Sequence, residues 1–116
     1  MNGVFEIAKL VDYQSIRTNP KPVIDMLLDE VNKNSDYLCK FKASNICGPS
    51  IKVLKENLVK NIAEHNKFTI EDNYYEISNI TFGVGGFIDT IMGMLPNLNK
   101  EVVSESICSM LISHKN

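Results

Sequence analysis

Thr81-Phe-Gly-Val-Gly-Gly-Phe-Ile-Asp89 is the stretch of this chain on which its expected fold depends. Glycine occupies three of the four positions from 83 to 86. Such a cluster is typical of backbone that turns sharply or approaches another group closely. We therefore expect Gly83, Gly85 and Gly86 to form a turn or hinge between a strand and a helix.

A glycine turn before a helix can bind an anion through backbone N–H groups. However, no Lys, Arg or His occurs from Phe68 through Asn99, so a phosphate would lack a cationic partner. The run also lacks the Gly-Lys-Ser/Thr ending of a phosphate loop and the spacing of a dinucleotide fingerprint. We therefore expect no cofactor.

The segment after the glycines is apolar around most of a helix. Its apolar residues are Phe87, Ile88, Ile91, Met92, Met94 and Leu95. A domain of this length buries only about two-thirds of its unfolded surface, so a few small helices would not easily cover such a helix. We expect these residues, with Ile112 on the last helix, to contact a protein partner or a second copy.

Upstream of the glycines, residues 68–70 and 75–77 alternate apolar and polar side chains around an acidic turn. This pattern predicts a β-hairpin near residues 67–78. Periodicity predicts helices over residues 3–14, 20–32, 50–65 and 100–113, with a strand as the alternative over 3–14. Residues 36–41 fit either a short helix or a strand. The expected fold is a single α+β domain over residues 1–116, with about five short helices and one hairpin.

The charge distribution suggests an alternative function, DNA binding. Residues 40–67 contain six Lys and two Glu, a net charge of +4. A helix over 50–65 followed by a hairpin resembles a winged helix, in which Lys52, Lys55 and Lys60 would contact phosphates. The hairpin is acidic and the chain has a single Arg. Both features oppose nucleic-acid binding, which we keep as a second hypothesis.

A third hypothesis is a small enzyme that uses a Cys/His site. The candidate side chains are Cys39, Cys47, Cys108, His65 and His114. Their spacing matches no zinc motif, and nothing in the sequence selects one Cys–His pair as nucleophile and base. We therefore name no metal ligand and no catalytic residue, and expect a protein that is not an enzyme.

Composition indicates where the protein acts. Eleven of twelve basic residues are Lys, and Asn and Ile each occur thirteen times. This bias is typical of AT-rich coding and suggests a phage, viral or mobile-element source. No export signal or membrane span is visible, and three cysteines favour a reducing compartment. We expect a cytoplasmic interaction protein, in the host cytoplasm if viral, that self-associates or modulates a protein target through region 83–112.

Overall fold

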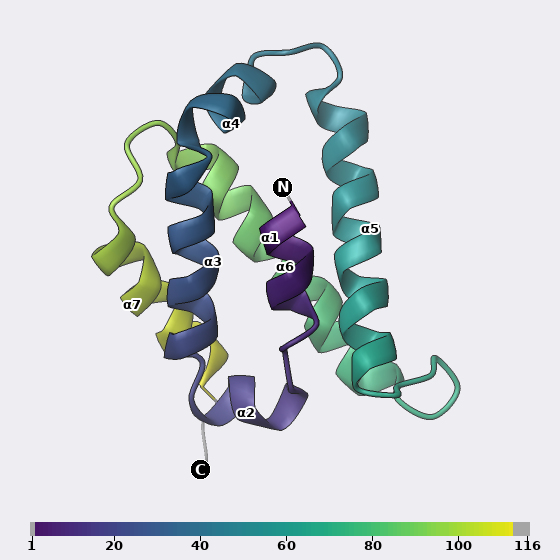
Figure 1. Ribbon diagram of the computed structural model, residues 1–116. Helices are drawn as coiled ribbons and strands as arrows, with labels where there is room; N and C mark the ends of the chain where they lie inside the picture. Colours follow the sequence, from purple (N-terminus) through teal and green to yellow (C-terminus); the bar gives the residue numbers. More distant parts are fainter. Residues whose placement is uncertain (1, 113–116) are drawn as a thin grey trace.

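The computed structural model describes residues 2–112, and within this range it contains seven α-helices and no β-strand. The fold is therefore all-α, and the expectation of an α+β domain with a hairpin is wrong. The helices, labelled in Figure 1, are α1 (Asn2–Ala8), α2 (Tyr13–Thr18), α3 (Lys21–Lys33), α4 (Ser35–Lys42), α5 (Cys47–His65), α6 (Tyr74–Met94) and α7 (Lys100–Leu111).

The longest helices enclose the first one. Helix α1 lies between α3 and α5 and contacts both, while α6 crosses behind them and packs along α5 (Figure 1). Helix α7 packs against the opposite side of α3, and α4 continues from the end of α3. The Lys42 Nζ donates to the backbone carbonyl of Leu95 at 2.9 Å, which ties α4 to the end of α6.

The predicted hairpin is a short loop followed by the first turn of α6. The Thr69 carbonyl accepts from the backbone N–H of Asn73, and the Asn73 side chain accepts from the Thr69 N–H, at 2.8 and 3.1 Å. Asn side chains favour such local bonds, which close a loop without any strand partner. Three alternating residues on each side were too short a pattern to separate a strand from a helix.

Helix α6 forms because its apolar residues keep helical spacing straight through the glycines. The continuous stripe comprises Ile77, Ile80, Val84, Ile88, Ile91 and Leu95. Three glycines within a helix cost about 1 kcal/mol each relative to alanine. Burying a large aliphatic side chain contributes roughly 1.5–3 kcal/mol, so the stripe outweighs the glycines. The expected turn at Gly83–Gly86 is consequently absent.

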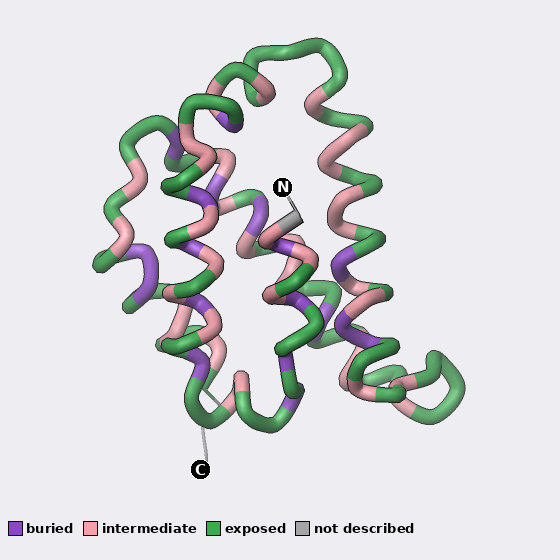
Figure 2. The backbone as a smooth tube through the Cα atoms, viewed as in Figure 1, coloured by how far each residue is buried: buried purple, intermediate pink, exposed green. Residues whose placement is uncertain are grey.

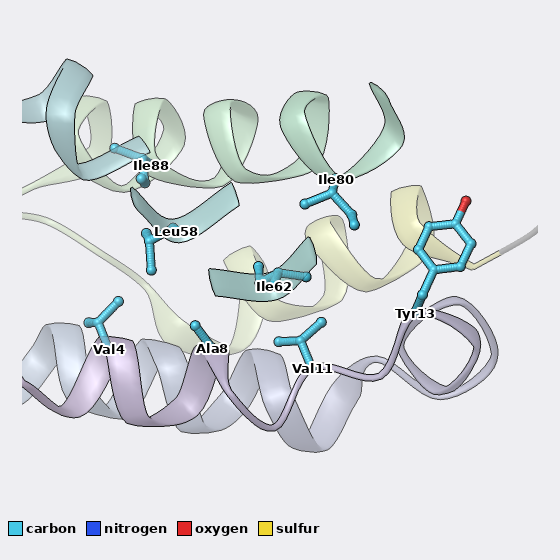
Figure 3. Close-up of a cluster of buried hydrophobic side chains, with 8 residues drawn as sticks. All are labelled: Val4, Ala8, Val11, Tyr13, Leu58, Ile62, Ile80 and Ile88. Carbon is cyan, nitrogen blue, oxygen red and sulfur yellow. The ribbon is translucent and has the colours of Figure 1, made fainter. Parts of the chain in front are cut away.

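The buried side chains form two clusters. Figure 2 marks the buried positions in purple along the backbone, where they recur between exposed positions on the helices. Figure 3 shows the first, in which Leu58 and Ile62 of α5 lie between α1 and α6. The second is centred on α3, α7 and the end of α6. Leu27, Phe87 and Met92 pack against both clusters and so make the core continuous.

Three predicted helices are confirmed within one to three residues, namely those over 20–32, 50–65 and 100–113, the last of which ends at Leu111. Residues 36–41 belong to helix α4. The helix predicted over 3–14 ends at Ala8, and a separate helix begins at Tyr13. The Asp12 side chain accepts from the Ser15 backbone N–H at 3.1 Å, an N-cap that starts this second helix.

Asn66, at the end of α5, holds the turn between α1 and α2. Its Oδ1 accepts from the backbone N–H of Tyr13 at 3.0 Å, and its Nδ2 donates to the carbonyls of Val11 and Ile62, both at 2.8 Å. One side chain thus satisfies backbone groups in two segments that are distant in sequence. No apolar residue of similar size offers these bonds.

We predict that Asn66→Ala lowers the free energy of unfolding by about 2 kcal/mol, because three hydrogen bonds are lost and a part-buried N–H is left without its acceptor. Urea unfolding followed by circular dichroism measures this change. Asn57→Ala, at an exposed position of α5, is the matched control and should leave stability nearly unchanged or slightly raise it. Equal effects of the two substitutions would contradict the role assigned to Asn66.

A buried serine joins α7 to α3. Ser104 is buried, and its hydroxyl donates to Asp25 Oδ1 at 2.6 Å. Lys21 lies 3.0 Å from the other carboxylate oxygen. The Ser104 hydroxyl and, second, Lys21 lower the pKa of Asp25 below its usual value. Because the folded state favours the ionised carboxylate, this contribution is present above the unfolded pKa near 4 and is lost as the pH falls through the folded pKa.

We predict that Ser104→Ala lowers the thermal midpoint by a few degrees at neutral pH and by less in acid, once the pH falls through the lowered pKa of folded Asp25 and its carboxylate becomes protonated. Calorimetry of both proteins across acidic and neutral pH gives the comparison. Ser106→Ala, at an exposed position of α7, serves as control. A difference between Ser104→Ala and the parent that does not shrink in acid would show that the bond to ionised Asp25 is not its cause.

Candidate partner-binding surface

The residues that the sequence assigns to an interface differ in burial: some are buried, some half-buried and some exposed. Ile88, Ile91 and Leu95 are buried in the core of the chain itself. They cannot contact a partner while the helices stay packed, so they hold α6 in place instead. Phe87 and Met92 are half-buried and pack against both core clusters.

Met94 and Ile112 are the exposed members of the predicted interface. They lie near the ends of α6 and α7, respectively. Neither belongs to the exposed face of α6 that lies opposite its buried stripe.

All of the glycines in the cluster lie inside α6, where none has a positive φ. A methyl group added at Gly83, Gly85, Gly86 or Gly93 would meet no atom within 4 Å beyond its own helical turn. Neither backbone conformation nor packing within the chain therefore requires glycine at these positions. Each glycine nevertheless weakens the helix relative to alanine.

The outer face of α6 carries a regular row of large and small side chains, which we call the aromatic–glycine stripe. Its members are separated by four, three, four, three and four residues, and all are exposed: Tyr75, Asn79, Phe82, Gly86, Asp89 and Gly93. Phe82 is 80% exposed and Tyr75 is 65% exposed. Spacing of this kind places side chains along one side of a helix, as in a coiled-coil seam.

Sequence reasoning missed Phe82, Tyr75 and Asn79 because it assigned residues 75–77 to a strand and began the next helix only after the glycines. The signal that finds them is the helical period of the buried stripe, continued upstream of Gly83. Once Ile77 and Ile80 are placed on the inner face, Phe82 must lie on the outer one.

Polar contacts position the first part of the stripe. The Asn79 Nδ2 donates to the Tyr13 hydroxyl at 2.8 Å, and Arg17 Nη1 donates to the same oxygen at 3.0 Å. The guanidinium also lies 5.5 Å from the centre of the Tyr13 ring. The Tyr13 hydroxyl and, to a smaller extent, the Tyr75 hydroxyl raise the pKa of Arg17 above its usual value. Helix α2 thus supports the start of α6 from the side.

An ion pair positions the second part of the aromatic–glycine stripe. Lys55 Nζ on α5 lies 2.7 Å from Asp89 Oδ1 on α6. Beside it, an open groove of about 520 Å³ runs between the two helices and is lined by residues that include Val59, Ala63, Ile77 and Gly85. Lys55, Glu56, Lys60 and Thr81 complete its lining, so apolar residues share this groove with polar and charged ones.

The structure removes the wing from the DNA-binding hypothesis, because residues 67–78 form a loop and a helical turn. Lys55, one of the three predicted phosphate contacts, faces Asp89. Lys52 and Lys60 are exposed on α5. Nucleic-acid binding without a wing stays a hypothesis that rests on these two lysines.

Within residues 2–112, no group of three or more His, Cys, Asp or Glu side chains is placed to hold a metal ion. Cys39, Cys47 and Cys108 are half-buried and free, and His65 is exposed. His114 lies outside the described residues. Across the same range, no helix has the length and apolar character needed to span a membrane.

Comparison of the chain with protein-family models, with curated proteins and with solved structures gives no match. The function is therefore inferred from the chemistry of its own surface.

We predict that Gly83→Ala and Gly85→Ala each raise the free energy of unfolding by about 0.5–1 kcal/mol, because alanine is the better helix former and the added methyl groups meet open space. Urea unfolding at low protein concentration measures the change. A loss of stability in either variant would show that glycine is needed for the fold, and so would contradict a role for these glycines at a surface.

Proposed function

We propose that this protein is a non-enzymatic protein-binding module whose contact surface is the outer face of α6. The observation that carries the proposal is Phe82, which is 80% exposed in the middle of the aromatic–glycine stripe. Covering an aromatic side chain of this size gains roughly 2–3 kcal/mol. A binding partner would supply that cover.

The composition of α6 supports this proposal. The helix has 21 residues and no Lys, Arg or His, and its acidic residues are Glu76 and Asp89. A helix that only faces water usually carries charges of both signs along its outer side. Protein interfaces are instead enriched in aromatic residues and depleted in Lys and Glu at their centre.

The glycines support the same use of the surface. They leave little side-chain bulk on the turn that follows Phe82, so another backbone can approach closely there, at the expense of helix stability. The original hypothesis of an interaction protein is thereby moved from the buried residues Ile88, Ile91 and Leu95 to the opposite side of the same helix.

All three cysteines are free, which favours a reducing compartment. This supports our proposal that the protein acts in the cytoplasm, or in the host cytoplasm if its source is a phage or virus.

The test is photo-cross-linking in the cells that naturally make the protein. A photoreactive phenylalanine at position 82 should give specific protein adducts. The same group at position 110 should not, although Met110 is 76% exposed on α7 and so equally accessible. Adding Gly86→Lys should abolish the adducts at position 82, since a long charged side chain would then fill the adjacent space. Equal labelling from positions 82 and 110 would argue against a dedicated surface.

A further inference from the structure

The proposed function does not identify the partner. The order of residues along α6 indicates which kind of partner fits. Resting on that proposed function, we infer that the partner is a second copy of this chain. Two α6 helices pack antiparallel through their aromatic–glycine stripes, with a two-fold axis at the level of Val84.

The stripe is self-complementary in size about this point. In an antiparallel pair, residues at equal distances on either side of the axis face each other. Phe82 precedes Val84 by two residues and Gly86 follows it by two, so each Phe82 ring meets Gly86 of the partner subunit. Tyr75 precedes Val84 by nine residues and Gly93 follows it by nine, so Tyr75 meets Gly93 of the partner subunit.

The remaining layer is complementary in hydrogen bonding. Asn79 precedes Val84 by five residues and Asp89 follows it by five. The Asn79 amide has a second N–H besides the one given to Tyr13, and the Asp89 carboxylate has a second oxygen besides the one nearest Lys55. An Asn79 amide can therefore donate to Asp89 of the partner subunit without breaking either internal contact.

The glycine cluster lies where this arrangement needs it. Two straight helices that cross are closest at the crossing point, and their separation depends on the side chains there. Gly83, Gly85 and Gly86 surround the level of Val84, while the Val84 side chain packs toward the core. The helices can thus approach more closely than side chains would allow, and the Phe82 rings can lie against backbone.

A parallel pair lacks all of these matches. Phe82 would then face Phe82 of the partner subunit, which forces the helices apart. Gly86 would face Gly86 of the partner subunit, which leaves a gap between them. Asp89 would also face Asp89, and like charges at a close layer repel. The sequence of the stripe therefore favours the antiparallel orientation over the parallel one.

The contact between the two subunits is long, but each chain contributes only one helix to it. The stripe spans about 27 Å at 1.5 Å per residue. An interface of this kind lies at the small end of specific protein contacts, and we expect a dissociation constant on the order of micromolar.

Sedimentation equilibrium of the purified full chain over a range around micromolar concentration tests the inference. The parent protein should form a dimer, and Phe82→Asp should weaken it at least tenfold, as expected of a central aromatic residue. Gly86→Leu should also dissociate the dimer while it raises the stability of the monomer, because leucine favours the helix but fills the space that Phe82 of the partner subunit occupies. Met110→Asp, on α7, is the control and should dimerise normally.

Disulfide cross-linking tests the orientation. In chains whose native cysteines are replaced by alanine, a mixture of Phe82→Cys and Gly86→Cys chains should give mixed dimers under mild oxidation. Dominance of Phe82→Cys homodimers would overturn the antiparallel register. A parent protein that stays monomeric throughout the concentration range would overturn the dimer altogether. Specific photo-adducts from position 82 with a different protein would, in that case, leave the proposed function standing without a second copy as partner.

Discussion

Burial of one apolar face of α6 is the constraint on which the rest of the structure depends. Ile80 and Ile88 lie against α1 and α5 in one cluster, and Ile91 and Leu95 lie with α3 and α7 in the other. One helix therefore joins both halves of the core. Its inward face is large enough to keep the helix continuous through residues that would break it in isolation. The same continuity fixes which side chains point outwards.

Much of the helical framework could be predicted, because Ile24, Leu27 and Leu28 combine spacings of three and four residues, which is typical of one face of a helix and not of a strand. The same reasoning could not have prevented the incorrect prediction of a hairpin. Tyr75-Glu76-Ile77 alternates over too few residues, and a glycine cluster downstream is a strong local indication of a turn. Tertiary burial overrode that local preference, and only the full period from Ile77 to Leu95 shows it.

The sequence assigned the expected partner contacts to the segment that forms the end of α6, and three of them, Ile88, Ile91 and Leu95, are buried in the core. An apolar segment such as Phe87–Leu95 does not reveal which of its residues face inwards until its neighbours are known. Ile88 and Ile91 proved to be core, whereas Phe82 stands exposed a few residues upstream. The glycines were recognised as unusual from the sequence. Their conformation is ordinary, and what distinguishes them is the empty space outside them.

The hydrogen bonds of Asn66 have a consequence for how the chain is made. Val11 and Asn66 are 55 residues apart, and α1 finds its cover on α3 and α5. A ribosome adds about 5–20 residues per second, so roughly 3–11 s separate the synthesis of these two positions. During that interval Val4, Ala8 and Val11 of the nascent chain lack the α5 residues that later enclose them. Helix α1 can therefore pack only after α5 has been synthesised. Folding of the amino-terminal segment follows the synthesis of the middle of the chain.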